Sequence, residues 1–282
     1  MLEAVVNVSE GRDRGRIGAI GAAAGRALVD VHTDPDHHRS VFTIAAREAA
    51  ATEAAARRLT EVALEDLDLT DHAGVHPRLG VVDVVPFVAL APTPADVAVA
   101  AAHAFGAWLA RTHRVPVFFY GEAASDGRIL PTVRREAFTA SLAPDLGPSA
   151  PDPHFGATAV GARPPLVAVN VELATTDLDV ARRIARETRE RDGGLLGVRA
   201  LGLPLASRDT VQVSMNLVDL AATGIERACT EVRDRARVWE VPVTRVELVG
   251  LLPAAELARC SDAFRAWTGL AERDTVEARV GA

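Results

Sequence analysis

Apolar residues in this chain alternate between strand-like and helix-like spacing, and this alternation limits the possible folds more than any other feature. In residues 49–67, apolar positions recur at helical spacing with charges opposite, whereas residues 3–9 form a short run typical of a strand. The first half predicts strands at residues 3–9, 28–31, 40–46 and 81–87 and helices at residues 11–26 and 49–67. This order is βαββαβ, the split pattern of ferredoxin-like folds.

The second half repeats this pattern without obvious sequence repetition. Strands are predicted at residues 166–173, 195–203, 210–217 and 243–249, and helices at residues 177–191 and 223–239. Between the halves we predict a helix at 95–113, a strand at 115–120, a helix at 131–142 and a proline-rich loop at 143–155. The tail from Pro253 is expected to be helical. We therefore expect an α/β (α+β) fold of two ferredoxin-like βαββαβ subdomains, residues 1–165 and 166–282, with a ligand groove between them.

Charge and composition exclude several classes of protein. The net charge is -7, whereas a non-specific nucleic-acid binder would usually carry a basic excess. Apolar runs stay below the roughly 18 residues that a membrane span needs, and the N-terminus lacks the pattern of a secretory signal. Cys229 and Cys260 are the only cysteines, which is no disulfide framework. We therefore expect a cytoplasmic protein that binds neither nucleic acid nor membrane.

Two predicted loops are rich in histidine. The first, residues 32–39, contains His32, His37 and His38 beside aspartates and Arg39. Histidine and aspartate are good metal ligands, but the spacing fits no zinc motif, so no metal is expected. A polar turn with Asp-Pro punctuation and a substrate-binding loop closed by Arg39 are the other interpretations.

The second loop contains His72 and the segment Gly74-Val75-His76-Pro77-Arg78. The following proline biases His76 toward an extended backbone at the entrance to a strand. An imidazole with a pKa near neutrality can move a proton in both directions, so His76 is a candidate catalytic residue. The alternative is a loop histidine bound to a backbone carbonyl.

Residues 156–163 are rich in glycine and alanine and end in arginine. Small residues let a backbone approach a ligand closely, and Arg163 could bind a carboxylate with two hydrogen bonds. The Gly-Lys-Ser/Thr ending of a phosphate loop is missing, and small residues also serve tight strand packing. Asn7, Asn170 and Asn216 each lie in or at the end of an apolar, strand-like stretch, where a buried amide needs hydrogen-bond partners.

Taken together, these segments resemble a known family. The strings VVNVSEG, DHHRSVFT, HPRLGVVDVVPF, FFYGEAA and FGATAVGAR occur in order, and VQVSMNLVDL and VELVGLLP follow them. They resemble the formiminotransferase domain of glutamate formiminotransferase, which is also found fused in formiminotransferase-cyclodeaminase. The resemblance covers nearly the whole chain.

The resemblance implies transfer of a formimino group from N-formimino-L-glutamate to tetrahydrofolate, with His76 as the catalytic residue. It further implies that tetrahydrofolate is a co-substrate and that the protein is a homodimer. The implied folate-binding residues are Gly156, Ala157, Thr158, Ala159, Val160, Gly161, Ala162 and Arg163, and the expected substrate-binding residues are Asn7, His38, Arg39 and Arg78.

Some positions depart from the family pattern. Val75 replaces the usual acid beside the histidine, Pro164 replaces a basic or polar residue, and His32 stands where some relatives carry aspartate. A lost carboxylate beside the base could shift its pKa or remove a substrate contact. Two alternatives stay open: a folate-binding homologue with altered or no transferase activity, and a metal-dependent hydrolase of formiminoglutamate built on His32, His37 and His38.

Overall fold

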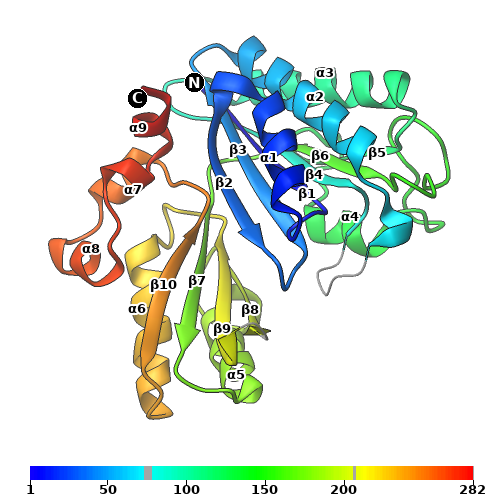
Figure 1. Cartoon of the computed structure of the whole chain (residues 1–282). Coiled ribbons are helices and arrows are strands. Elements are labelled where there is room, and N and C mark those ends of the chain that lie inside the picture. The colour runs from blue at the N-terminus through cyan, green and yellow to red at the C-terminus, as the bar shows by residue number, and fades with distance from the viewer. Residues whose placement is uncertain (73–77, 206–207, 282) are drawn as a thin grey trace. The chain divides into compact units, whose positions relative to one another are not determined.

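The computed structural model describes residues 1–72, 78–205 and 208–281 (Figure 1). The chain divides into two compact units, Met1–Arg163 and Pro164–Ala282. The first unit contains a six-stranded sheet and the second a four-stranded sheet. In the described part of the chain, no helix combines the length and the apolar character that a membrane crossing requires.

The sheet of the first unit has the order β2-β3-β1-β4-β6-β5. Its strands are β1 (Leu2–Val8), β2 (Leu28–Asp34), β3 (Arg39–Ala46), β4 (Val82–Ala89), β5 (Val117–Gly121) and β6 (Thr158–Ala162). The pairs among β1 to β4 are antiparallel, whereas β6 runs parallel to both β4 and β5. Parallel strands cannot be joined by a tight turn, and the chain reaches β5 from β4 through the helix α3 (Ala95–Thr112).

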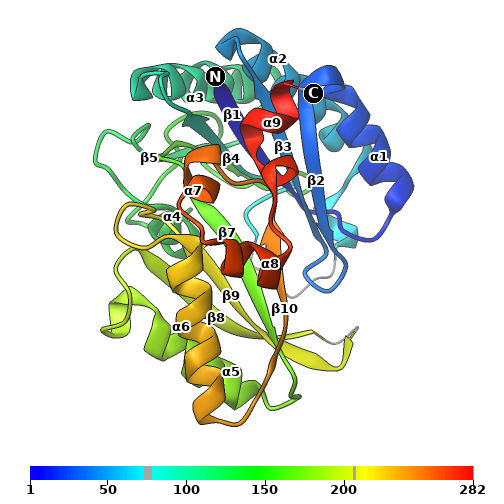
Figure 2. The same cartoon turned by 90° about the vertical axis from the view of Figure 1, so that its left-hand side faces the viewer.

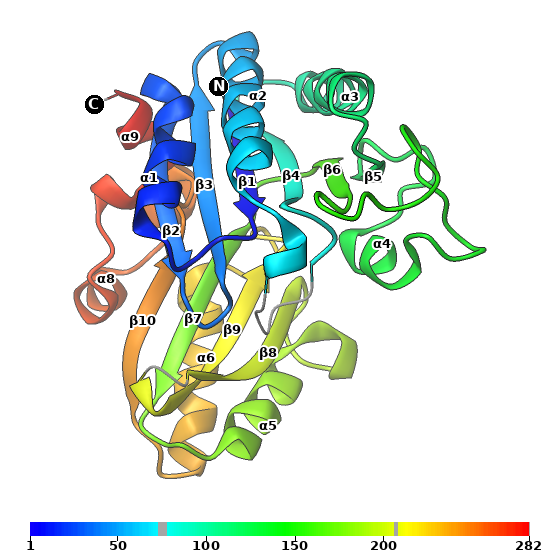
Figure 3. The same cartoon turned by 45° about the vertical axis from the view of Figure 1, so that its right-hand side comes forward.

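Helices cover both faces of this sheet. Besides α3 they are α1 (Arg14–Ala23), α2 (Ala49–Asp66) and α4 (Leu130–Glu136). Figure 3 shows α1, α2 and α3 over one face, where Leu59 of α2 joins Phe87 of β4 in the main core. Val84 of β4 points the other way, into a smaller core with Val133 of α4. Strand β4 therefore contributes to two cores, which accounts for its nearly continuous apolar sequence.

The second unit has a sheet of the order β10-β7-β9-β8, in which all neighbours are antiparallel. Its elements are β7 (Val167–Leu173), α5 (Leu178–Thr188), β8 (Val198–Leu205), β9 (Thr210–Leu217), α6 (Ile225–Val238), β10 (Val243–Val249), α7 (Ala254–Ala258), α8 (Asp262–Thr268) and α9 (Val276–Gly281). Helices α5 and α6 cover one face (Figure 2), where Ile184 and Val232 pack with Val171 and Val213. Short 3-10 helices occur at η1 (Gly25–Ala27), η2 (Leu69–Asp71), η3 (Glu190–Asp192) and η5 (Glu272–Asp274).

The predicted order of strands and helices agrees with the structure within both βαββαβ patterns, but strand β6 (Thr158–Ala162) was not predicted. In each unit the four strands of the βαββαβ pattern are arranged as fourth, first, third and second. The tail from Pro253 is helical, as expected, although it is divided into short helices. The main difference between the halves is that the first sheet is extended by β5 and β6.

Two of the predicted boundaries that differ from the structure have a clear physical reason. Residues 32–34 belong to β2 rather than to a loop, because they pair in register with residues 39–41 of β3. Helix α4 ends at Glu136 rather than at residue 142, because Ala137 leaves the helical conformation with ψ of 132° and Phe138 has a positive φ of 61°. The loop between β2 and β3 is thus shorter than the sequence pattern predicts.

Candidate active site

Leu79, which follows the predicted catalytic residue His76 in the sequence, is held by two hydrogen bonds. Residues 73–77, and with them His76, lie outside the described residues. Directly after them, the Leu79 N–H donates to Oδ1 of Asp83 at 2.7 Å. The Leu79 carbonyl oxygen accepts from the N–H of Ala157 at 2.9 Å. The chain therefore returns to the sheet at a defined place beside β4 and β6.

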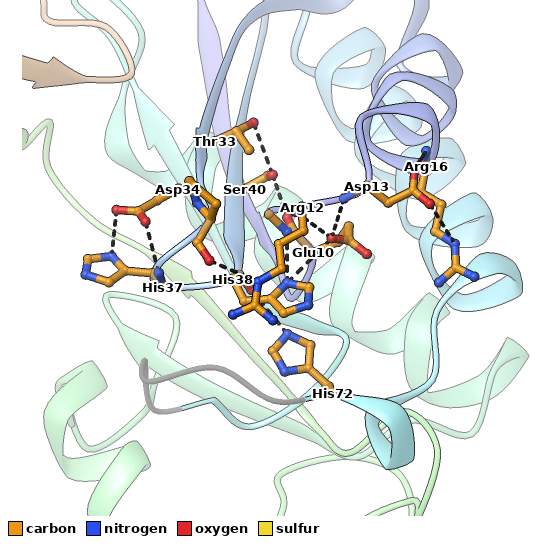
Figure 4. Close-up of polar contacts among 12 residues, drawn as sticks. Glu10, Arg12, Asp13, Arg16, Thr33, Asp34, His37, His38, Ser40 and His72 are labelled. Carbon is orange, nitrogen blue, oxygen red and sulfur yellow. Dashed lines mark hydrogen bonds and ion pairs between the residues drawn. The ribbon is translucent and has the colours of Figure 1, made fainter. Parts of the chain in front are cut away.

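His38 and His72 face each other in the first unit (Figure 4). Their ring centroids are 4.1 Å apart and their planes are inclined by 33°. Nε2 of His72 lies 3.1 Å from Nη1 of Arg78 and 3.2 Å from the carbonyl oxygen of His38. A guanidinium can only donate and a carbonyl can only accept, so the two contacts belong to alternative tautomers of His72. The structure thus brings the predicted residues His38 and Arg78 together around His72.

The main chain holds His38 in one tautomer. Its Nδ1 accepts a hydrogen bond from the N–H of Gly11 at 3.1 Å, which places the ring proton on Nε2. Burial lowers the pKa of His38; the Glu10 carboxylate raises it, and Arg12 and Arg78 lower it further. His38 is therefore a neutral imidazole near pH 7, with an Nε2–H group that can donate.

Asp83 binds two arginines that come from different elements. Nη1 of Arg39 donates to Oδ2 of Asp83, and Arg134 donates through both terminal nitrogens at 3.3 Å and 2.7 Å. Arg39 also directs Nε and Nη2 toward Oδ1 of Asn7, at 3.1 Å and 2.9 Å. The Asp83 side chain is fully buried, whereas those of Arg39 and Arg134 keep 12% and 20% of their surface exposed. Solvent therefore reaches the arginines of this network but not its carboxylate.

A β-bulge in β4 directs Asp83 to this network. The register of β4 against β1 shifts between Asn7 and Val8, which leaves Asp83 as the extra residue. In a regular pleat Asp83 would point to the same face as Phe87, into the main core. Its bonds to Arg134 instead take the carboxylate toward α4, which covers the opposite face.

Burial and the neighbouring donors shift the pKa of Asp83 in opposite directions. Burial alone would raise it, but the charges of Arg39 and Arg134 and the hydrogen bond from Leu79 lower it to about 2. Burial lowers the pKa of Arg39; Asp83 raises it, and Arg134 lowers it further. Asp83 is therefore ionised at neutral pH and carries one negative charge between two guanidinium groups.

Arg163, a predicted folate-binding residue, follows β6 and lies within electrostatic range of Tyr120. Burial raises the pKa of Tyr120 to about 12, although Arg163 and Arg134 act in the opposite direction. The ring of Tyr120 fits because residue 161 is glycine: a Cβ atom on Gly161 would lie 2.5 Å from it. Tyr120 thus lies in the electrostatic field of Arg163, Arg134 and Asp83 together.

The glycine- and alanine-rich segment forms a buried strand. Thr158–Ala162 is β6, lies between β4 and β5, and is buried along its whole length. Ala157 is buried in the smaller core. At Gly156 the backbone approaches Gly80, and a Cβ atom on Gly156 would lie 2.1 Å from the carbonyl oxygen of Leu79. Packing therefore accounts for the small residues, and folate binding by this segment stays a prediction.

The histidines of the first loop are spread along the β2–β3 hairpin. His32 lies on β2 itself, and Nδ1 of His37 is 3.2 Å from Oδ2 of Asp34. His38 lies instead beside Glu10, with 3.5 Å between Nδ1 and Oε1. Among the described residues, no three His, Cys, Asp or Glu side chains gather closely enough to hold a metal ion. The described geometry gives no support to the metal-dependent hydrolase.

The second unit has a polar sheet face opposite its helices. Glu172 of β7 forms ion pairs with Arg208 and with Arg245 of β10. Two residues earlier on β7, the Asn170 side chain donates to Glu247 at 3.2 Å. Asn170 therefore has the hydrogen-bond partner that an amide in an apolar strand requires.

Two family models match the sequence in succession. The N-terminal subdomain of the formiminotransferase domain matches residues 1–163, and the formiminotransferase domain matches residues 168–275. The chain belongs to the formiminotransferase family. The resemblance predicted from the sequence motifs is thereby confirmed.

Several relatives in the formiminotransferase family are similar over long stretches. A glutamate formimidoyltransferase of Thermoplasma acidophilum is 34% identical over 99% of this chain and 97% of its own length. A protein of the same name from Streptococcus pyogenes serotype M1 is 35% identical over 91% of this chain and 90% of its own length. The formimidoyltransferase-cyclodeaminase of Sus scrofa is 38% identical over 91% of this chain, which spans 51% of that relative.

Sequence reasoning missed two central side chains in this member of the formiminotransferase family. Asp83 and Arg134 join the predicted residues Asn7 and Arg39 in one network. A signal for Asp83 was available, because a charged residue within the apolar run 81–87 must be paired if it is buried. Arg134 gave no such signal, since arginine is common on the surface of a short helix.

Proposed function

We propose that this chain transfers a formimino group from N-formimino-L-glutamate to tetrahydrofolate. The observation that carries the proposal is the 34% and 35% identity, over at least 90% of both lengths, to two proteins named glutamate formimidoyltransferase. The two family models support the same function. Tetrahydrofolate is then a co-substrate, and the reaction belongs to histidine degradation and one-carbon metabolism.

His76 is the proposed catalytic residue. N5 of tetrahydrofolate forms a bond to the formimino carbon, which gives a tetrahedral intermediate, and His76 accepts the proton that N5 loses. His76 then returns a proton to the glutamate nitrogen as the bond from that nitrogen to the carbon breaks, and glutamate departs. One imidazole can serve both steps because the protons move in sequence, and such help is worth about 10²- to 10⁴-fold.

Substrate binding is assigned to polar residues of the first unit. Asn7, His38, Arg39 and Arg78 are proposed to hold the anionic substrate. His38 is supported by its neutral Nε2–H donor, and Arg39 by a guanidinium that Asn7 and Asp83 hold in place. The folate-binding residues Gly156 to Arg163 are proposed from the family pattern, with Arg163 as the charged member.

The finer features of the architecture belong to the same proposal. Two ferredoxin-like subdomains, residues 1–165 and 166–282, are proposed with a ligand groove between them. The strand order of fourth, first, third and second, with antiparallel neighbours, supports the ferredoxin-like assignment in each. A homodimer is proposed from the family resemblance, a cytoplasmic location from the cysteine content and the N-terminal sequence, and a reaction without a metal from the spacing of the histidines.

Turnover of N-formimino-L-glutamate, measured with and without tetrahydrofolate, tests the function. The expected result is 5-formiminotetrahydrofolate and glutamate in equal amounts, and only when tetrahydrofolate is present. His76→Ala is expected to lower turnover by about 10²- to 10⁴-fold. His103→Ala, which removes an exposed histidine of α3, is the control and should leave turnover unchanged. Full turnover by the His76 variant would contradict the catalytic assignment.

The two alternatives predict different results in the same experiment. Tight folate binding without any transfer would favour a folate-binding homologue, for which the departures Val75 and Pro164 leave room. Turnover that ignores folate and is abolished by a chelator would favour the metal-dependent hydrolase.

A further inference from the structure

We propose that Asp83 is a positioning residue that presents Arg39 and Arg134 as a two-arginine site for a substrate carboxylate. This inference rests on the proposed function and deepens it, because both proposed substrates carry carboxylates. Asp83 and Arg134 are new to the site, since neither the sequence pattern nor the family resemblance assigned them a role.

The hydrogen-bonding capacity of Asp83 is taken up within the protein. Oδ1 accepts from Leu79 at 2.7 Å and from Arg134 at 3.3 Å, and Oδ2 accepts from Arg39 and from Arg134 at 2.7 Å. Each oxygen thus has two donors, and the side chain is fully buried. Asp83 can therefore affect a ligand only through the arginines that it holds.

Arg39 keeps donors that the protein does not use. A guanidinium has five N–H groups, and the bonds to Asn7 and Asp83 occupy one on each of its three nitrogens. One N–H on each terminal nitrogen is left without a partner among the residues that the structure describes. The Arg39 side chain keeps 12% of its surface exposed to solvent. A carboxylate is the anion whose two oxygens suit such donors.

Three arginines lie around the carboxylate of Asp83. Arg39 and Arg134 both bind it, and Arg78 lies within electrostatic range of both Asp83 and Arg39. A second cation that is mostly removed from water is stabilised when an anion binds beside it.

The β-bulge supports a role beyond packing. The bulge turns the ionised Asp83 side chain away from the main core and toward Arg39 and Arg134. It lies at the start of β4, a few residues after His76 in the sequence. Bulges are over-represented next to active sites because they re-aim a side chain in this way. Rigid support of this kind is what a binding arginine needs in order to hold its ligand in one orientation.

The chemistry recognised is a carboxylate, and the two substrates offer two sources of it. One is N-formiminoglutamate itself, and the other is the glutamyl tail of tetrahydrofolate. The Michaelis constants for the two substrates, measured separately, distinguish these sources. An effect on one of them identifies the source, and an effect on neither overturns the proposal.

The variants for this experiment are Arg134→Gln, Arg134→Lys and Asp83→Asn. Arg134→Gln is expected to raise KM for one substrate by about 10- to 100-fold, the loss typical of a charged hydrogen bond, with kcat changed far less. Arg134→Lys keeps the charge without the two-point bond to Asp83, so it should recover only part of the affinity. Asp83→Asn should raise KM for the same substrate, because it leaves the arginines without their support.

Arg128→Gln is the matched control. Arg128 is buried to a similar degree, with 11% of its side chain exposed, and it also binds two carboxylates, those of Asp126 and Asp145. Arg128→Gln should leave KM unchanged for both substrates. If Arg128→Gln and Arg134→Gln changed KM equally, or if Arg134→Gln changed neither KM in a folded protein, the network would be structural only.

A binding measurement separates this inference from the proposed function. L-Glutamate, the product with two carboxylates, is expected to raise the thermal midpoint of the wild-type protein more than L-glutamine does, and Arg134→Gln should abolish that difference.

If the wild-type protein transferred no formimino group but kept this response to L-glutamate, the proposed function would fail and the carboxylate site would stand. If transfer occurred and Arg134→Gln left both constants unchanged, the site would fail and the function would stand.

Discussion

Gly80 and Gly156 face each other across an isolated antiparallel bridge that has no room for a side chain on either residue. A Cβ atom on Gly80 would lie 2.2 Å from the carbonyl oxygen of Ala157, and one on Gly156 would lie 2.1 Å from the carbonyl oxygen of Leu79. This contact fixes the chain where it enters β4, directly after the segment of the proposed catalytic histidine. The two glycines therefore hold residues 79 and 80 close against residues 156 and 157.

Gly156→Ala is expected to lower the free energy of unfolding by about 3 kcal/mol, because the new methyl group meets backbone and the residue has a positive φ. Gly127→Ala is the control, since Gly127 has a similar φ of 66° but nothing within 4 Å of a Cβ atom. The control should lose only about 1 kcal/mol, the usual cost of a left-handed conformation. Urea unfolding measures both, and equal losses would show that the close contact is unimportant.

Asp83 should make stability depend on acid pH. Its pKa is about 2 in the folded chain and about 3.9 when unfolded, so its ion pairs stabilise the fold above about pH 4. This contribution, about 2 kcal/mol, is lost as the pH falls from about 4 toward 2. The difference in unfolding free energy between wild type and Asp83→Asn should therefore shrink by that amount between pH 7 and pH 2.5. A constant difference would contradict the assignment.

His38 is expected to be neutral at pH 7 with its proton on Nε2, because Nδ1 accepts from the Gly11 N–H. Its pKa is lowered in the fold, chiefly by burial, so protonation favours the unfolded chain. Stability from this residue should therefore fall as the pH drops below about 6.5, the ordinary value for histidine. Nitrogen-15 NMR of the ring, assigned with His38→Gln, gives both tautomer and pKa. A proton on Nδ1 would refute this reading.

The two cysteines should resist thiol reagents in the folded protein. Cys229 and Cys260 are both buried, and burial raises the pKa of the Cys229 thiol strongly and that of Cys260 to about 11. The thiolate is the reactive form, so little of it exists at pH 8. Titration with a chromogenic disulfide should detect no fast-reacting thiol in the native protein and two per chain in urea. A fast native reaction would show that one of these sites opens readily.

The order of elements could be predicted because hydrophobic spacing is a local property. The amphipathic pattern of 49–67 gave α2 (Ala49–Asp66) nearly to the residue. The helix predicted at 131–142 failed where one residue, Phe138, adopts a positive φ that tertiary contacts impose. The polar side chains of residues 32–34 predict a loop, but these residues form a strand because they pair with β3.

The candidate site was predictable only in part, because its network depends on the register between strands. Arg39 and Asn7 were predicted from the sequence and the family pattern, but the bulge that turns Asp83 toward Arg134 arises from a shift between β1 and β4. The residue spacing within β4 does not reveal that shift in register, and Arg134 lies 51 residues after Asp83 in the sequence. The sequence therefore predicts Asn7 on β1 and Arg39 on β3 as site residues, but it does not predict that Asp83 belongs to their network.

The two units have separate hydrophobic cores, and this affects how the stability of the chain must be measured. Trp108 packs in the main core of the first unit, whereas Trp267 packs against that of the second and Trp239 lies at the end of α6 with Arg183 over its ring. The tryptophan fluorescence of the chain is thus the sum of signals from two units that need not unfold together. In a Trp108→Phe variant, only the tryptophans of the second unit would fluoresce. Subtraction of its fluorescence from that of the wild-type protein would give the signal of the first unit, which holds Asp83 and Gly156.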